Sequence, residues 1–168
     1  MKAFNRLRMR RKKIPLKVRK ALASGNVRQA RIELGEFYSI QGSVDTGNQL
    51  GRTLGYPTAN LKPNEDSPLF LANGVYAVKV RHHKIMYKGM ANIGIRPTME
   101  QHELTIEVNL FDFNEDLYGQ KITIYFIERI RDELKFPDLD ALKMQISKDK
   151  EQILELFRHR NHSDSDPT

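Results

Sequence analysis

The sequence predicts a mainly β protein in which an antiparallel sheet closes into a small barrel, with short helices before it and a long helix after it. Three observations support this fold. Apolar residues follow helical spacing over residues 16–34, alternate with polar residues between Phe37 and Ile127, and return to helical spacing over residues 138–157. A chain of 168 residues is long enough for one ordinary core. We expect a basic arm and helical pair over residues 1–34, one barrel domain with its helix over 35–157, and a disordered tail over 158–168.

The segment from residue 16 to residue 34 predicts two short helices separated by a stop signal and a start signal. Gly25 can end the first helix, because glycine readily adopts the left-handed conformation of a helix C-terminus. Asn26 can cap the second helix, since its side chain accepts a hydrogen bond from a free backbone N–H. The apolar residues expected to face the core are Leu16, Val18 and Leu22 in the first helix and Val27, Ala30 and Leu34 in the second.

The middle of the chain predicts strands. Apolar residues at every second position place one face of each segment in a core, and Gly, Pro and Asn separate the segments. Successive short strands without intervening helices favour an antiparallel barrel over a βαβ fold. The alternating segments are Tyr38 to Val44, Val75 to Val80, Leu104 to Leu110 and Ile122 to Phe126.

The last periodic segment, from Asp138 to Phe157, predicts one long helix with an apolar stripe facing the barrel. The stripe consists of Leu139, Leu142, Ile146, Ile153 and Phe157. The polar residues that follow it predict a disordered tail.

The charge of the chain is concentrated at its start. The net charge is +7, yet residues 1–31 hold 12 of the 28 Lys and Arg residues and none of the 21 Asp and Glu residues. Such an arm can bind nucleic acid through phosphate contacts, but a basic run is more often a solvated tail, and no aromatic residue after Phe4 interleaves with its charges. We therefore do not expect nucleic acid as the partner.

Other features restrict the class of protein. The chain has no cysteine, so disulfides and thiolate metal sites are excluded. No apolar run approaches the roughly 20 residues that span a bilayer, and the basic start lacks the apolar core of a signal peptide. We expect a cytoplasmic monomer that does not bind membranes.

The segment GRTLGYPTAN, residues 51–60, predicts a shaped loop that presents two polar side chains. Gly51 and Gly55 allow close approach of the backbone to a ligand, and Pro57 stiffens the chain before the polar pair. Thr58 and Asn60 point to the same side of an extended segment. Two neutral oxygens suit a Mg²⁺ ion that takes its other ligands from water and nucleotide phosphates. A plain turn capped by Asn60 explains this loop equally well when the loop is considered alone.

Glu107 lies on the opposite face of its predicted strand from the alternating apolar residues. A carboxylate at such a position is most often a solvated surface charge. Beside a metal–phosphate site, however, it can accept the proton of an attacking hydroxyl group. In contrast, His82 and His83 occupy a predicted hairpin tip, where we expect solvent exposure rather than metal binding, and His159 and His162 have no expected role.

Five segments in uninterrupted order closely resemble the riboflavin kinase module of prokaryotic bifunctional riboflavin kinase and FAD synthetase enzymes. The resemblance covers residues 35–157 and implies a six-stranded antiparallel Greek-key barrel with a long C-terminal helix. It also implies transfer of the γ-phosphoryl group of ATP to the 5′-hydroxyl of riboflavin, which gives FMN and ADP. The segments are GSVDTGNQLGRTLGYPTANL (42–61), NGVYAVKV (73–80), YKGMANIGIRPT (87–98), TIEVNLFDFNEDLYGQ (105–120) and IRDELKF (130–136).

The resemblance implies a nucleotide site. Thr58 and Asn60 match the residues that hold the Mg²⁺ of ATP. Gly47, Gly51 and Arg52 match a flap that closes over the phosphates, and we count Arg52 among the catalytic residues. The strand after the catalytic position is implied to form the adenine side of the site, through Leu110, Asp112 and Tyr118.

The resemblance also implies a flavin site and a catalytic base. Glu107 matches the proposed base. The segment from Gly94 to Thr98 matches a second mobile loop near the substrates, which adds Arg96 and Thr98 to the expected flavin contacts. The residues that match positions near the isoalloxazine ring are Arg131, Glu133 and Phe136.

The sequence departs from the bifunctional enzymes before the barrel. Their adenylyltransferase domain ends in a motif with serines, which KKIPLKVR lacks, and the segment before it is too short for a nucleotide-binding domain. We therefore expect no FAD synthesis. Two alternatives to a kinase stay open: a catalytically idle flavin-binding module, and a basic-armed barrel that binds nucleic acid.

Overall fold

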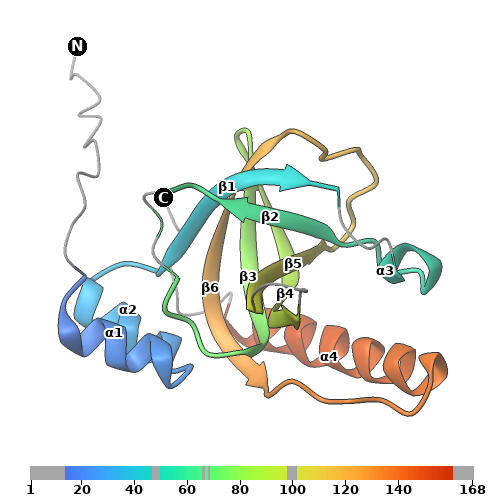
Figure 1. The fold of residues 1–168 in the computed structure, drawn as a ribbon. Helices are drawn as coiled ribbons and strands as arrows, with labels where there is room; N and C mark the ends of the chain where they lie inside the picture. The colour runs from blue at the N-terminus through green and yellow to red at the C-terminus, as the bar shows by residue number, and fades with distance from the viewer. Residues whose placement is uncertain (1–13, 47–49, 66, 68, 98–101, 161–168) are drawn as a thin grey trace.

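The computed structural model describes residues 14–46, 50–65, 67, 69–97 and 102–160 of the chain. Figure 1 shows a β-barrel with a helical pair at one side and a long helix across another. The elements in chain order are α1 (Leu16–Ala23), α2 (Val27–Leu34), β1 (Ser39–Asp45), α3 (Leu50–Thr53), β2 (Ala59–Pro63), β3 (Gly74–His82), β4 (Ile85–Pro97), β5 (His102–Leu110), β6 (Lys121–Arg131) and α4 (Leu139–Arg160).

The six strands form a closed antiparallel barrel in the order β1-β2-β5-β4-β3-β6. Strands β3, β4 and β5 are neighbours in succession, and β6 returns to lie beside β3. This arrangement is a Greek key, because the fourth strand pairs with the first of three consecutive strands. The predicted mainly β fold, with six antiparallel strands and a C-terminal helix, is therefore confirmed.

The barrel interior is filled by the alternating apolar residues of the strands. Tyr76 and Phe126 are fully buried there, and their rings pack edge to face with centroids 5.5 Å apart. Ile106 and Val108 of β5 belong to the same core cluster. The period-two pattern therefore identified the inward face of the strands correctly, because every second side chain of a barrel strand points inward.

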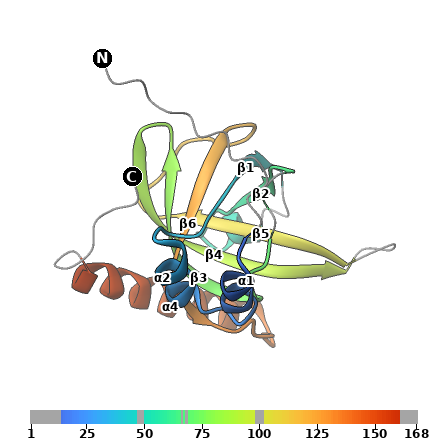
Figure 2. The same ribbon diagram turned by 90° about the vertical axis from the view of Figure 1, so that its left-hand side faces the viewer.

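The two helices form as predicted, except that Leu16, expected to face the core, is 58 % exposed, because it is the first residue of α1. Asn26 caps α2 by accepting a 3.0 Å hydrogen bond from the backbone N–H of Gln29, and Gly25 adopts a φ of +77°. Val18 and Leu22 are fully buried and join the barrel core cluster. The pair is thus part of the same packed unit as the barrel, and Figure 2 shows it beside the strands.

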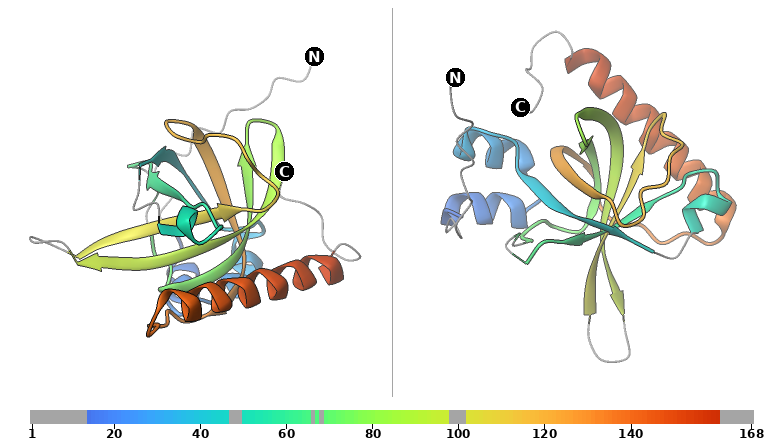
Figure 3. Two further views of the ribbon diagram at one scale, coloured as in Figure 1. Left: turned by 90° about the vertical axis from the view of Figure 1, so that its right-hand side faces the viewer. Right: turned by 90° about the horizontal axis from the view of Figure 1, so that it is seen from above.

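Helix α4 crosses the outside of the barrel and extends past it (Figure 3). Asp138 caps the helix by accepting a 2.8 Å hydrogen bond from the N–H of Ala141. Ile153 and Phe157 are buried in a second core cluster between helix and barrel. The prediction for Leu139 was wrong: its side chain is 53 % exposed, because it lies in the first turn of the helix, at the end of the stripe.

Two other features differ from expectation. His82 was expected to be solvent-exposed with His83, but it is buried, because it ends β3 beneath the ring of Phe113, 5.9 Å away between centroids. Helix α4 continues to Arg160, past the expected start of the tail at residue 158.

The basic arm over residues 1–13 and residues 161–168 of the tail lie outside the described residues. Within the described part of the chain, no helix is long and apolar enough to cross a membrane.

Candidate active site

Two neighbouring cavities meet at Thr58. The first, of about 340 Å³, lies between the outer face of the barrel, α3, the segment after β6, and the first half of α4. The second, of about 510 Å³, lies between α3, the end of β5 and the loop over residues 111–120. Thr58 lines both cavities. Each volume lies in the range of about 300–1,000 Å³ that is typical of small-molecule sites.

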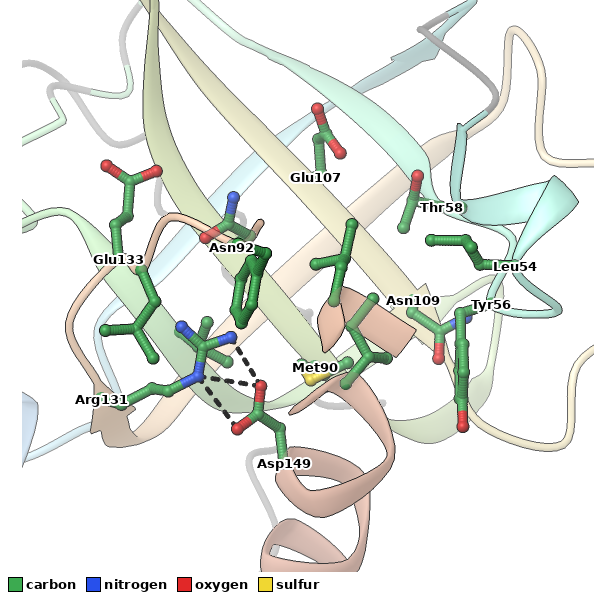
Figure 4. A pocket seen from close by; sticks show the side chains of 16 residues that line it. Leu54, Tyr56, Thr58, Met90, Asn92, Glu107, Asn109, Arg131, Glu133 and Asp149 are labelled. Carbon is green, nitrogen blue, oxygen red and sulfur yellow. Dashed lines mark hydrogen bonds and ion pairs between the residues drawn. The ribbon is translucent and has the colours of Figure 1, made fainter. Parts of the chain in front are cut away.

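Glu107 lines the first cavity from the middle of β5 (Figure 4). Its neighbours Ile106 and Val108 point into the barrel core, so the predicted outward orientation of Glu107 is confirmed. In the sheet register, Glu107 is directly opposite Asn60 of β2 on one side and Asn92 of β4 on the other. A carboxylate therefore lies between two carboxamide-bearing positions, one of which belongs to the predicted metal pair.

The loop before Thr58 is fixed by two hydrogen bonds and by close backbone packing at Gly51. The N–H of Tyr56 donates a 2.7 Å hydrogen bond to the carbonyl of Gly51, which closes the chain after α3. The Nδ2 of Asn109 donates a 2.7 Å hydrogen bond to the carbonyl of Pro57. A side chain at Gly51 would meet the carbonyl oxygen of Tyr56, so glycine is required there for close approach rather than for an unusual φ. Thr58 is thereby held at the junction of the cavities.

The second cavity gathers several residues of the predicted nucleotide site. Arg52 of α3 and Leu110 and Tyr118 line it. The resemblance had implied that Leu110, Asp112 and Tyr118 belong to one strand. Leu110 is the last residue of β5, but Asp112 and Tyr118 lie in the loop that follows it. Asp112 is exposed and does not line this cavity. Asp116 stabilises the loop, since its carboxylate accepts a 2.9 Å hydrogen bond from the N–H of Tyr118.

The first cavity contains the predicted flavin residues from the chain after β5. Arg131, Glu133 and Phe136 all line it. Glu133 accepts a 3.2 Å hydrogen bond from the Nδ2 of Asn73 and lies against Gly94, where a Cβ atom would meet its carboxylate. The other expected site positions, Gly47, Thr98 and the side chain of Arg96, lie outside the described residues.

Sequence reasoning missed an ion pair at the base of the first cavity. Arg131 binds the buried carboxylate of Asp149 on α4, through Nε at 3.0 Å and Nη2 at 2.7 Å (Figure 4). A signal for Asp149 existed, because it lies on the apolar stripe of α4 between Ile146 and Ile153, where a carboxylate is unexpected. Sequence reasoning also missed Asn92 and Asn109. In the part of the chain that the structure describes, no group of three or more His, Cys, Asp or Glu residues could hold a metal ion.

Comparison with known proteins adds a family assignment to this geometry. A family model described as "Flavokinase: Riboflavin kinase" matches residues 34–157. Two curated relatives are the bifunctional riboflavin kinase/FMN adenylyltransferases of Haemophilus influenzae and Bacillus subtilis, at 44 % and 43 % identity. Each match covers 83 % of this chain and 45 % of the relative. The chain therefore spans less than half the length of these relatives.

Two solved structures are also similar. One, from Streptococcus pneumoniae and described as a macrolide-efflux protein, has a TM-score of 0.77 at 41 % identity, over 82 % of this chain and 45 % of that one. The other, riboflavin kinase from Trypanosoma brucei, has a TM-score of 0.50 at 24 % identity, over 77 % of this chain and 91 % of that one. The second likeness concerns the fold alone.

Proposed function

Because the chain belongs to the riboflavin kinase family, we propose that it transfers the γ-phosphoryl group of ATP to the 5′-hydroxyl of riboflavin, which gives FMN and ADP. The observation that carries this proposal is the meeting of two cavities at Thr58. A phosphoryl transfer needs separate sites for donor and acceptor that converge on one reacting position. Riboflavin occupies the first cavity, ATP the second, and the phosphoryl group passes near Thr58.

The lining of the first cavity suits a flavin. The walls carry apolar side chains from β3, β4, α4 and the segments after α3 and β6, which can pack against a flat ring system. Asn92 and Arg131 supply polar groups for its edge. The ring end lies toward Arg131, Glu133 and Phe136, and the ribityl chain extends toward Glu107. Arg96 and Thr98 remain proposed contacts of the same substrate. The apolar walls consist of Leu54, Val75, Met90, Leu134, Phe136, Leu142 and Ile146.

The residues at and beside the junction suit a Mg²⁺–nucleotide: Thr58 lines both cavities, and Asn60, which lines neither, lies opposite Glu107 in the sheet. Thr58 and Asn60 would hold the ion with their neutral oxygens, and phosphate and water oxygens would complete its shell. When bound, Mg²⁺ neutralises charge on the phosphates. Arg52, which lines the second cavity, supplies a further positive charge, and Gly51 lets the backbone approach closely. Gly47, Leu110, Asp112 and Tyr118 remain proposed contacts of the nucleotide.

Glu107 acts on the acceptor. Its carboxylate faces the first cavity, where it orients the 5′-hydroxyl and accepts its proton as the new bond to phosphorus forms. Because phosphoryl transfer depends mainly on positioning and charge neutralisation, Glu107 shares the catalytic work with the Mg²⁺ site. We propose a monomer as the working unit. We place this reaction in the cytoplasm, where ATP is available.

Incubation with riboflavin, ATP and Mg²⁺, followed by chromatographic separation of flavins, tests the proposal. We expect FMN and no FAD. Riboflavin that is bound but unchanged would favour an idle flavin-binding module, and an FAD peak would contradict the expected lack of adenylyl transfer. Salt-dependent retention on DNA or RNA without riboflavin turnover would favour the nucleic-acid-binding alternative.

A further inference from the structure

We propose that Asp149 is a positioning residue for riboflavin, which acts by fixing the guanidinium group of Arg131 at the ring-binding end of the first cavity. This inference rests on the proposed function. It concerns a charged residue of α4, whereas the α4 residues with proposed roles above, Leu142 and Ile146, contribute only apolar wall to the first cavity. Figure 4 shows Arg131 between the carboxylate of Asp149 and the side chain of Asn92, with Glu107 farther away.

The contacts hold Arg131 in one orientation. Its Nε donates to both oxygens of Asp149 at 3.0 Å, and its Nη2 donates to Oδ2 at 2.7 Å. Its Nη1 donates at 2.9 Å to the carbonyl of Asp132. Such a two-pronged contact between guanidinium and carboxylate fixes both the position and the plane of the guanidinium group. The ring of Phe136 lies 5.9 Å from its central carbon.

Asp149 is itself positioned. Its side chain is 2 % exposed, and its Oδ1 accepts a 2.8 Å hydrogen bond from the Nε2 of Gln145, one turn earlier on α4. The helix is anchored on the barrel by Ile153 and Phe157, which are buried in the second core cluster. The orientation of Arg131 is therefore set by a chain of contacts that runs through α4 to the barrel.

Stability alone gives a weak reason for this arrangement. Burying a carboxylate has a large desolvation cost, and apolar residues of similar size often replace a buried ion pair without loss of stability. The cavity supplies a better reason. Together, Arg131 and Asp149 present no net charge to the cavity. Each terminal nitrogen of Arg131 donates one of its two N–H groups in these contacts, so each has a second N–H group for a ligand.

A neutral, flat donor group suits the isoalloxazine ring. Its pyrimidine-like end carries carbonyl oxygens that accept hydrogen bonds, and riboflavin has no charge that would require a free cation. A guanidinium group can both donate to such oxygens and stack on aromatic rings. Asp149, which lines the base of this cavity, would thus affect the affinity for riboflavin by fixing Arg131.

Titration of riboflavin fluorescence, together with the KM values for riboflavin and ATP, tests this role. Asp149→Asn keeps the shape but removes the carboxylate, so we expect the Kd for riboflavin to rise about 10- to 100-fold, the scale of one lost charged hydrogen bond. The KM for ATP should change less than about twofold. Glu151→Gln, the same chemical change at an exposed position of α4, should behave as wild type. Arg131→Lys should weaken riboflavin binding as well. In the double variant the two effects should not add, because both substitutions break the same contact between Arg131 and Asp149.

The outcomes separate this inference from the proposed function. A folded Asp149→Asn protein that binds riboflavin as wild type does, or that loses riboflavin and ATP affinity equally, overturns the positioning role alone. A wild-type protein that does not bind riboflavin overturns the proposed function and this inference with it. If Asp149→Asn does not fold, Gln145→Met decides: it removes only the bond to Oδ1, and an unchanged Kd for riboflavin would overturn the role, whereas a rise of about two- to tenfold would support it.

Discussion

The Nδ2 of Asn109 donates a 2.7 Å hydrogen bond to the backbone carbonyl of Pro57, and so ties the residue before Thr58 to the strand that carries Glu107. Asn109 is buried, and it lies on the same face of β5 as Glu107, two positions along the strand. One strand therefore carries the proposed base and also fixes the proposed metal ligand. This hydrogen bond, together with the pairing of Ala59 with Val108, sets the separation of the two groups.

Asn109→Ala should lower the apparent affinity for Mg²⁺–ATP. The variant loses the hydrogen bond and leaves the carbonyl of Pro57 without that partner, which allows Thr58 to move. We expect the KM for ATP to rise about two- to tenfold, in line with a net hydrogen-bond contribution of about 0.5–1.5 kcal/mol. Asn64→Ala, at an exposed position, serves as the control. Unchanged nucleotide kinetics in a folded Asn109→Ala protein would show that the loop before Thr58 does not need this bond.

The fold was largely predictable because its strands bury one face each. Alternation identified the inward residues of β5 and β6, and helical spacing with capping signals identified α1, α2 and α4. Helix α3 could not be found in this way, since four residues are too few to show a period. His82 was misjudged because residues near a hairpin tip are usually exposed, and only the fold places Phe113 over it.

The candidate site was predictable only where local sequence carries its chemistry. The alternation in β5 put Glu107 outside the barrel core, and the glycines and proline near Thr58 indicated a shaped loop. The pairing of Glu107 with Asn60 and Asn92 depends on strand register, which the sequence of one strand does not contain. The contact between Arg131 and Asp149 joins two elements through their packing, so it follows from the tertiary structure.

Asn60→Ala should weaken the proposed Mg²⁺ site without changing its charge. Removal of one neutral oxygen should raise the KM for ATP and lower kcat, and excess Mg²⁺ should restore part of the loss. Steady-state FMN production at several Mg²⁺ concentrations measures both effects. A variant whose defect does not respond to Mg²⁺ would remove Asn60 from the metal shell.

Tyr38 should make the protein sensitive to alkaline pH. Burial raises the pKa of its hydroxyl group to about 12, against an ordinary value of 10.0. Above pH 10 the unfolded chain ionises at this residue before the folded chain does, so the free energy of unfolding falls as the pH rises. Between pH 10 and 11.5 the loss from this residue should reach about 1.5 kcal/mol.

Urea unfolding of wild type and Tyr38→Phe at both pH values measures this loss. The variant should lose about 1.5 kcal/mol less than wild type between them, because phenylalanine does not ionise. Tyr118→Phe, at a residue that is 41 % exposed, should follow wild type. Parallel curves for wild type and Tyr38→Phe would contradict the predicted shift.

Removal of residues 1–13 should leave the kinase reaction nearly unchanged. These residues contribute seven of the 28 basic side chains, but every described residue that lines the two cavities lies after residue 43. We expect kcat and both KM values to stay within about twofold of wild type. Circular dichroism should confirm that the shortened protein is folded. Loss of turnover by a folded protein would mean that the arm contacts a substrate.

Glu107→Gln should separate proton transfer from nucleotide binding. Glutamine keeps the shape of the side chain but cannot accept the proton of the 5′-hydroxyl, so kcat should fall about 10²- to 10⁴-fold, the usual scale of general-base catalysis. Calorimetric titration with a nonhydrolysable ATP analogue should give nearly the wild-type affinity, and excess Mg²⁺ should not restore turnover, in contrast to Asn60→Ala. Glu65→Gln, at an exposed position, controls for the loss of a carboxylate. Normal turnover would exclude Glu107 from the mechanism, whereas loss of nucleotide binding would show that its role is structural, because Glu107 lies opposite Asn60 in the sheet.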